Sequence, residues 1–374
     1  MGRKKQPASR PDYKLMAVAS LLLIGGILIL ASVSAPYSQA RYGTSYYFLK
    51  RQILVGLLPG LFLGFLAFKI KLSFLKKWSP LLLLLNLFLL ALVFIPGIGL
   101  KIEGASRWLN LGLISFQPSE FLKITFIVYL AAWLAGRSEK GKNLGKSFIF
   151  FLIILALVAV SLILQPDIST LAVISTVAVI MYFSVKTPLF HSLFIVGSGA
   201  AILFFLIKLA PYRFSRLEVF LNPDLDPMGK GYQLKQAVIA IGSGGVRGTG
   251  LGMSVQKFLI GLLPQPISDS IFVVFSEETG FIGATTLVVL FLIFLLIGFK
   301  ISKRAKDKFG QLAALGITCW IIIQAFVNIG AMIRLLPLTG IPLPFISYGG
   351  SSMVALLIAL GILLNISKKS NLAK

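Results

Sequence analysis

A single carboxylate, Asp269, lies at the end of the longest polar stretch of the chain and directly before an apolar run. That stretch covers residues 211–270 and collects basic residues and glycines ahead of the aspartate. Its basic residues include Arg213, Arg216, Lys230, Lys235, Arg247 and Lys257, and six glycines lie from Gly242 to Gly252. Basic side chains bind phosphate, and a carboxylate can take the proton of a hydroxyl group. The pattern predicts a site for a substrate that bears phosphate and an attacking hydroxyl.

The glycine segment 242–252 leaves two interpretations open. It reads Gly-Ser-Gly-Gly-Val-Arg-Gly-Thr-Gly-Leu-Gly, which fits neither the dinucleotide fingerprint nor the P-loop. The sequence therefore predicts no soluble nucleotide cofactor. The backbone N–H groups could form a nest for a phosphate, or the glycines could let the loop pack tightly on a helix.

Four further charged residues lie beside or inside apolar runs. Glu120 and Lys123 are three residues apart at the start of a predicted helix, so they share a face and can form an ion pair near hydrocarbon. Arg107 precedes Trp108 at the expected membrane interface, where its guanidinium could hold a phosphate with two hydrogen bonds. Asp167 follows a proline in a tight turn, and it either caps the next helix or acts in the site.

Two adjacent acids, Glu277 and Glu278, follow Asp269 within the next apolar run. In a continuous helix they would lie roughly 12 Å below Asp269 at 1.5 Å per residue. Acids at that depth are costly unless they are paired, so the sequence predicts an inward-pointing pair with a buried partner.

The composition is that of an integral membrane protein. Hydrophobic residues make up 57% of the chain and charged residues 13%, against roughly 25% charged in soluble domains. A membrane-spanning helix needs roughly 20 apolar residues. We expect spans near residues 15–34, 53–68, 79–97, 121–136, 147–165, 170–185, 189–210, 271–299, 312–333 and 342–366. The predicted fold is all-α, a polytopic bundle of about ten transmembrane helices with one long extracytoplasmic loop, residues 211–270.

The net charge of +24 comes from basic residues whose distribution along the chain indicates membrane topology and not a surface that binds nucleic acid. With the N-terminus in the cytoplasm, every second loop is basic, which is the positive-inside pattern. Both termini are then cytoplasmic, including tails 1–14 and 367–374, and most acids fall on the outer side. We therefore place the chemistry at the outer face of a single membrane domain, residues 1–374.

Counts of cysteine and histidine exclude two classes of site. The chain has one cysteine, Cys319, and one histidine, His191, so neither a zinc site built from these residues nor a Cys/His catalytic pair is available. The basic N-terminus is followed by no small-residue cleavage site, so the first apolar run is expected to stay as an anchor.

Six ordered motifs resemble one family across nearly the whole chain. They are Gly104-Ala-Ser-Arg-Trp108, Phe116-Gln-Pro-Ser-Glu-Phe-Leu-Lys123, Gln165-Pro-Asp167, Ala240-Ile-Gly-Ser-Gly-Gly245, Ser268 to Gly280, and Leu343 to Ser352. The chain resembles the SEDS family (shape, elongation, division and sporulation), bacterial membrane proteins that polymerise lipid II into glycan strands. Ser270-Ile-Phe272 and the Arg51-Gln52 entry to the second span favour the division type, FtsW, over the elongation type, RodA.

The resemblance implies roles for particular residues. Asp269 is implied as the essential acid. The substrate cavity is implied to be lined or supported by Arg51, Arg107, Glu120, Lys123 and Asp167. As general base, Asp269 would take the proton of the acceptor sugar's 4-hydroxyl, which displaces undecaprenyl pyrophosphate with inversion. We expect Arg107 and Lys123, with Lys257 and the glycine segment, to neutralise that leaving group.

The resemblance also implies partners and a location. A class B penicillin-binding protein and other division-complex membrane proteins are the expected partners, in the bacterial cytoplasmic membrane. No cofactor is required by the sequence, and a divalent cation, Mg²⁺ or Mn²⁺, is left open. Three alternatives remain: an elongation polymerase of the RodA type, a flippase for the lipid-linked precursor, and a scaffold without activity. A carrier would place charges near the membrane midplane, whereas here they gather at the outer face.

Overall fold

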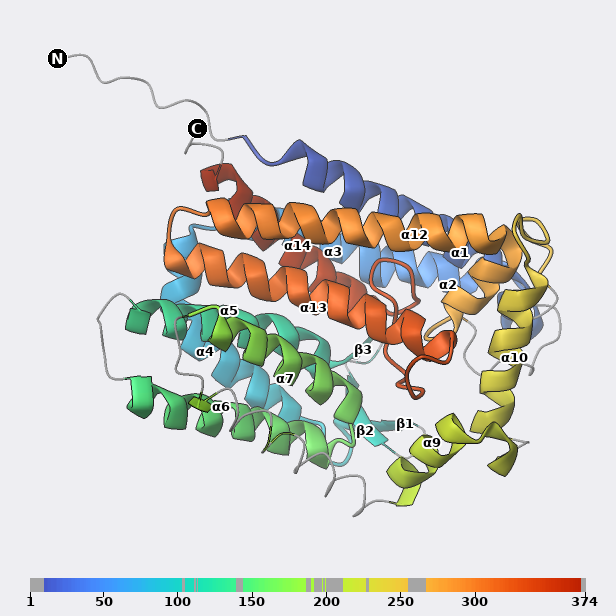
Figure 1. Cartoon of the computed structure of the whole chain (residues 1–374), viewed down its shortest axis with the longest axis horizontal. Helices are drawn as coiled ribbons and strands as arrows, with labels where there is room; N and C mark the ends of the chain where they lie inside the picture. The colour runs from blue at the N-terminus through green and yellow to red at the C-terminus, as the bar shows by residue number, and fades with distance from the viewer. Residues whose placement is uncertain are drawn as a thin grey trace.

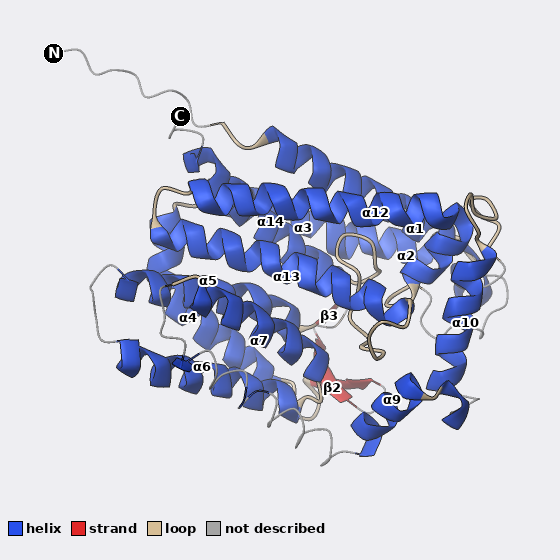
Figure 2. Cartoon of the chain, in the orientation of Figure 1, coloured by secondary structure: helices blue, strands red, loops and turns tan. Residues whose placement is uncertain are grey.

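The computed structural model describes residues 10–102, 105–110, 112, 114–138, 144–185, 190–191, 197, 199, 211–226, 229–254 and 267–370. Within these residues the chain is a bundle of helices with one small sheet at one end (Figures 1 and 2). The helices of the first half are α1 (Tyr13–Tyr42), α2 (Tyr47–Arg51), the π-helix η1 (Gln52–Leu57), α3 (Leu58–Lys69), α4 (Leu72–Leu92), α5 (Pro118–Ser138), α6 (Leu144–Leu164) and α7 (Ile168–Phe183). Those of the second half are α9 (Pro211–Leu221), the 3₁₀ turn η2 (Pro223–Leu225), α10 (Lys230–Ser243), α12 (Ile271–Arg304), α13 (Lys308–Met332) and α14 (Gly350–Ser370).

The described helices match nine of the ten predicted spans. Seven are long and apolar enough to cross a membrane, and α6 and α7 contribute two shorter apolar helices. The predicted span 189–210 lies almost entirely outside the described residues. The chain is therefore a multi-pass membrane protein of the predicted helical class.

The last predicted span begins later than expected. Helix α14 starts at Gly350 and not at 342, because Pro342 and Pro344 lack the N–H groups that a helix interior uses. Phe345 has φ +68°, a left-handed conformation that no helix continues. Residues 341–349 form a loop that packs into the bundle instead.

A three-stranded antiparallel sheet was not predicted. Strands β1 (Gly99–Ile102), β2 (Ala105–Asn110) and β3 (Ser115–Phe116) follow α4 in the order β1-β2-β3. The strands are two to six residues long and lie between glycines, so their alternation gives a weak sequence signal. The sheet carries Arg107 at the end of the bundle.

Helix α13 lies at the centre of the bundle, where it packs against α5, α7, α12 and α14 (Figure 1). Its side chains are buried along almost its whole length, from Phe309 to Met332. Polar groups on such a helix must find partners inside the protein. This is the element that organises the candidate site.

The two ends of the bundle differ. At one end the start of α1 meets the end of α14, and the backbone N–H of Asp12 donates to Ser367 Oγ at 3.0 Å. Asp12 also caps α1 through its side chain, which accepts from the N–H groups of Lys14 and Leu15. The sheet, α9 and α10 lie at the opposite end (Figure 1). The described part of the polar stretch 211–270 contains α10, in which Leu234, Ala237 and Ala240 are buried.

Helix α12 consists of two helical segments joined by a kink. Gly280 has φ +67° and ψ −165°, a backbone conformation open almost only to glycine. Figure 1 shows the short segment before the kink running back from the end of the long helix toward the loop after α13. Asp269, Glu277 and Glu278 all precede this kink, so the two acids lie in one helical segment, residues 271–279, that follows Asp269 as predicted. The kink itself, which separates this segment from the rest of the span, was not predicted.

Candidate functional site

Asp269 lies half-buried in the turn 267–270 that leads into α12. Its backbone carbonyl accepts a hydrogen bond of 2.8 Å from Asn328 Nδ2 on α13. A methyl group placed on Gly340 would lie 3.8 Å from Asp269 Oδ2, so the carboxylate faces the backbone of the 341–349 loop and the residue before it. That loop also holds the turn, since Tyr348 N donates to the carbonyl of Ile267 at 2.9 Å. The candidate base is thus held between α13 and one loop.

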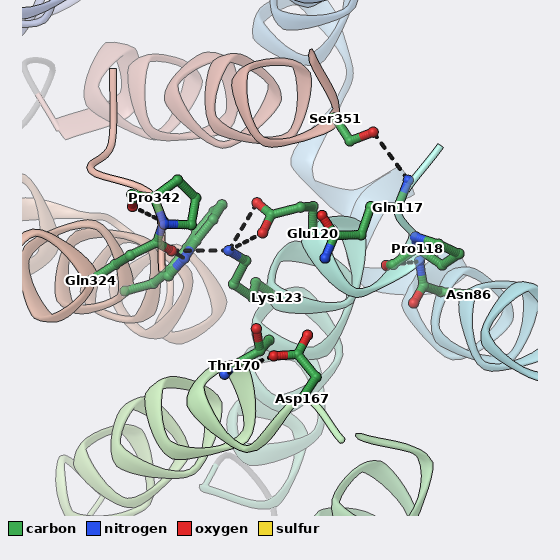
Figure 3. Close-up of polar contacts among 11 residues, drawn as sticks. Asn86, Gln117, Pro118, Glu120, Lys123, Asp167, Thr170, Gln324, Pro342 and Ser351 are labelled. Atoms are coloured by element: carbon green, nitrogen blue, oxygen red, sulfur yellow. Dashed lines mark hydrogen bonds and ion pairs between the residues drawn. The ribbon is translucent and has the colours of Figure 1, made fainter. Parts of the chain in front are cut away.

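The Glu120–Lys123 pair predicted from spacing is confirmed. Lys123 Nζ on α5 lies 2.9 Å from both carboxylate oxygens of Glu120 and 2.9 Å from Gln324 Oε1 on α13 (Figure 3). It also lies 5.1 Å from the ring centre of Trp320. Lys123 is 1% exposed and Glu120 is 3% exposed.

Lys123 is buried, and the hydrogen bonds of its Nζ go to the Glu120 carboxylate and to Gln324. Because Lys123 is 1% exposed and its ammonium group is bonded to protein partners, the structure gives it a supporting position and not one open to a pyrophosphate. Gln324 extends the connection, because its Nε2 donates to the carbonyl of Pro342 at 2.8 Å. The ion pair is therefore joined through α13 to the loop beside Asp269.

Asp167 caps α7, as one of the two sequence interpretations expected. Its Oδ1 accepts from the N–H of Thr170 at 3.3 Å. Its Oδ2 is buried and has no hydrogen-bond partner within the described part of the chain. On the same helix start, Ser169 Oγ donates to the carbonyl of Thr339 at 2.7 Å, next to Gly340. The cap of α7 therefore reaches the loop that faces Asp269.

Arg107 on β2 is half-buried and bonded to protein carbonyls. Its Nε donates to the carbonyl of Gln165 at 3.1 Å, and Nη2 donates to the carbonyl of Pro166. Pro166 has φ +27°, so this turn is held in an unusual backbone conformation. The sequence expectation treated the guanidinium as open to phosphate, whereas the structure shows part of it holding the turn before Asp167.

Arg51 is the last residue of α2, directly before the π-helix η1, and lies beside an aromatic cluster. Its Nη1 is 3.5 Å from the hydroxyl of Tyr47, and Tyr47 stacks on Tyr42 with ring centres 3.7 Å apart. Burial raises the pKa of the Tyr348 hydroxyl, and the nearby positive charge of Arg51 opposes this shift. The next residue, Gln52, accepts from the N–H of Gly349 at 3.0 Å. Arg51 is thus placed beside the same 341–349 loop.

The glycine segment packs on the α12 kink. A side chain on Gly248 would meet the carbonyl oxygen of Glu278 at 2.2 Å, and one on Gly244 would meet that of Ser276 at 2.5 Å. Thr249 N donates to the carbonyl of Glu277 at 3.0 Å. Of the two interpretations left open by the sequence, these contacts favour tight packing of loop on helix.

Glu277 and Glu278 are both buried, at 2% and 3% exposure. Ser254 Oγ donates to Glu277 Oε2 at 2.5 Å. Ser32 Oγ on α1 lies 3.0 Å from Glu278 Oε2. Buried partners were expected, and the hydroxyls supply them at the kink.

Comparison with known proteins decides the family. The family described as cell cycle protein, which joins FtsW, RodA and SpoVE, matches residues 13–372. The chain belongs to the FtsW/RodA/SpoVE family. Stage V sporulation protein E of Bacillus subtilis is 40% identical over 371 residues, covering 96% of this chain and 98% of the relative. A probable peptidoglycan glycosyltransferase FtsW of Nitrosococcus halophilus is 38% identical over 369 residues, covering 98% and 94%.

Solved structures agree with this assignment to the FtsW/RodA/SpoVE family. One chain, from work on structural coordination of polymerization and crosslinking by a peptidoglycan synthase complex, has a TM-score of 0.79 at 26% identity. It covers 96% of this chain and 98% of that chain. Rod shape determining protein RodA of Thermus thermophilus has a TM-score of 0.70 at 25% identity, covering 96% of each chain.

Two polar residues of α13 that contact the site were not identified from the sequence. Gln324 and Asn328 are four apart in the apolar run of α13, so they lie on one face of the helix. Polar side chains inside a span generally face protein and mark functional positions. That spacing is the signal that could have found them.

Lys257 and a divalent cation were the other two features considered for the site. Lys257 lies outside the described residues. Among those described, no three His, Cys, Asp or Glu side chains form a group that could hold a metal ion. A magnesium ion held mainly by substrate phosphates needs only one or two protein carboxylates.

Proposed function

We propose that this chain is a peptidoglycan glycosyltransferase that polymerises lipid II into glycan strands for septal wall synthesis. Relatives named FtsW carry the description probable peptidoglycan glycosyltransferase. The observation that supports the role most directly is Asp269, a half-buried carboxylate fixed where α13, the 341–349 loop and the start of α12 meet.

In this proposal Asp269 is the general base. Its carboxylate takes the proton of the acceptor sugar's 4-hydroxyl as that oxygen forms a bond to the anomeric carbon of the donor. The bond from that carbon to the pyrophosphate oxygen breaks, and undecaprenyl pyrophosphate leaves with the electron pair. The donor sugar is α-linked and the product is β-linked, so the configuration inverts. Such proton transfer typically contributes about 10² to 10⁴ in rate.

The other residues of the site are proposed to have three different roles, according to their contacts. Arg51 and Arg107 are the cations proposed to face the pyrophosphate, because each retains N–H donors beyond the bonds made in the described structure. Glu120 and Lys123 are proposed to support the cavity through Gln324 and not to touch the leaving group. Asp167 is proposed to orient a donor group with its Oδ2, which lacks a partner in the described part of the chain.

The orientation and partner follow the same proposal. The described basic segments at residues 69–71 and 300–308 lie at the end of the bundle that holds Asp12 and Ser367, because Ile70 and Gly310 lie beside Asn365 and Ile366 of α14. From the positive-inside rule we infer that this end is cytoplasmic. Asp269 then faces the extracytoplasmic side of the bacterial cytoplasmic membrane. A class B penicillin-binding protein is the proposed partner, since a similar solved chain comes from a peptidoglycan synthase complex. Other division-complex membrane proteins are proposed as further partners.

The test is lipid II polymerisation by the purified chain with its penicillin-binding partner. Asp269→Asn should lower the rate by about 10² to 10⁴. The matched control is Asp224→Asn, an exposed acid of the same outer segment whose side chain is 76% exposed. The control should polymerise at the wild-type rate. A wild-type rate for Asp269→Asn would remove Asp269 from the mechanism, and precursor transport by proteoliposomes without any polymer would favour the flippase.

A further inference from the structure

We propose that Asn328 is the positioning residue that sets the place of the Asp269 carboxylate. Asn328 lies on α13 and is 1% exposed. Its Nδ2 donates to two backbone carbonyls, that of Asp269 at 2.8 Å and that of Ile341 at 2.7 Å. The inference deepens the proposed function, because it rests on Asp269 being the base.

The two carbonyls belong to the two segments that meet at the carboxylate. One belongs to Asp269 itself. The other belongs to Ile341, the residue after Gly340, whose backbone faces Asp269 Oδ2. Asn328 Nδ2 therefore holds the backbone of Asp269 and also the backbone of Ile341, next to the glycine that the Asp269 carboxylate faces. Misplacement of a catalytic group by about 1 Å can lower the rate about 10²-fold.

No regular secondary structure holds this region in place. Asp269 lies before α12 begins, and residues 341–349 have no helix or strand. Side-chain amides of α13 instead hold the start of the 341–349 loop. Gln324, one helical turn before Asn328, donates to the carbonyl of Pro342, which follows Ile341. Two amides on one face of α13 thus bind two consecutive carbonyls, and the spacing of the helix sets the position of the loop.

The chemistry of the position requires an amide donor. Both neighbours of Nδ2 are carbonyl acceptors, so a flipped amide or a carboxylate would place oxygen against oxygen. An apolar side chain of similar size would remove the Nδ2 donor from both carbonyls, and losing hydrogen bonds inside a protein is costly.

The chain contains a matched control for this bonding pattern. Asn365 on α14 is also buried, and its Nδ2 donates to two carbonyls, those of Ala67 and Ile70. It lies at the other end of the bundle, near Lys368 and the end of α3. Losing the Asn365 amide removes the same kind of contact without touching the site.

The experiment compares Asn328→Leu and Asn365→Leu in the full chain with its penicillin-binding partner. Polymerisation kinetics are measured together with the fraction of folded protein. We expect Asn328→Leu to lower kcat about 10²-fold with KM for lipid II changed less than threefold. Asn365→Leu should keep kcat once corrected for folded protein. Equal corrected kcat values for the two variants would overturn the positioning role.

Two further variants keep the test decisive. If Asn328→Leu does not fold, Asn328→Ser keeps one donor, and it should show a smaller kcat loss than Asp269→Asn at unchanged KM. A wild-type kcat for the serine variant would overturn the inference. Asp269→Asn is measured in parallel, because its retention of activity would refute the proposed base. Loss of activity in Asp269→Asn with a wild-type kcat for the Asn328 variants would refute the positioning role alone.

Discussion

Lys123 Nζ lies 2.9 Å from Gln324 Oε1, and this contact joins two helices that are 201 residues apart in sequence. The ammonium group also binds both carboxylate oxygens of Glu120, so a complete ion pair is buried against α13. Two opposite charges in a dry interior are stable only while both are present. The first prediction tests this dependence.

Glu120→Gln should destabilise the protein by about 3 to 5 kcal/mol, because it leaves the Lys123 ammonium group buried without its anion. The double variant Glu120→Gln with Lys123→Met should recover most of that stability, since no unpaired charge remains. Thermal unfolding in detergent measures both. Cys319, the single cysteine of the chain, is 5% exposed, so its reaction with a thiol dye reports unfolding. Equal unfolding temperatures for the single variant and the wild type would contradict the prediction.

Two neighbouring glycines of α1 give a second prediction. A methyl group on Gly26 would lie 2.2 Å from the carbonyl oxygen of Phe345, whereas one on Gly25 would meet nothing within 4 Å. Gly26→Ala should therefore displace the 341–349 loop and lower both the unfolding temperature and the polymerisation rate. Gly25→Ala is the matched control and should behave as the wild type. A normal rate for Gly26→Ala would show that the loop tolerates displacement from α1.

Local features of the site were predictable from the sequence. The spacing of Glu120 and Lys123 indicated an ion pair, and the structure confirms it at 2.9 Å. A helix cap was one of the two interpretations of Asp167 that the sequence left open, and its carboxylate accepts from Thr170 N. Both depend on residues three apart, whose relation a helix or turn dictates directly.

The remaining features depend on contacts between distant segments. Arg107 was expected to face phosphate, but part of its guanidinium binds carbonyls 58 and 59 residues away. Asn328 reaches Asp269 across 59 residues. The kink at Gly280 depends on the backbone of Gly248 and Val246, which no local pattern indicates. Hydrophobic periodicity specifies where a helix lies but not which neighbour its polar atoms will meet.

A third prediction concerns the outer segment between α9 and α10. A hydrogen bond from Lys235 lowers the pKa of the Asp224 carboxyl below its ordinary value of 3.8, and the positive charge of Lys235 adds to this. Lys235→Gln should return that pKa toward 3.8. Titration of protein carrying ¹³C-labelled aspartate carboxyls, observed by NMR, measures the change.

The sign of the stability effect follows from this shift. The pKa is lower in the folded state than in the unfolded state, so the contribution is present above pH 3.8 and is lost as pH falls through the folded value. Because Asp224 is exposed, that contribution is small and falls with added salt. An identical aspartate titration in wild type and Lys235→Gln would contradict the contact.

Variants of Arg107 distinguish a role for its positive charge from a role for its two hydrogen bonds. Its guanidinium donates to two consecutive carbonyls, those of Gln165 and Pro166, and so holds the turn before Asp167. Arg107→Lys keeps the positive charge but cannot make both bonds from a rigid fork. Losing a hydrogen bond to a charged group costs about 1.5 to 3 kcal/mol. Arg107→Lys should therefore lower polymerisation about tenfold or more, close to the loss in Arg107→Gln, with lipid II polymerisation as the measurement. Full activity in the lysine variant, with loss only in the glutamine variant, would show that Arg107 acts through its charge alone.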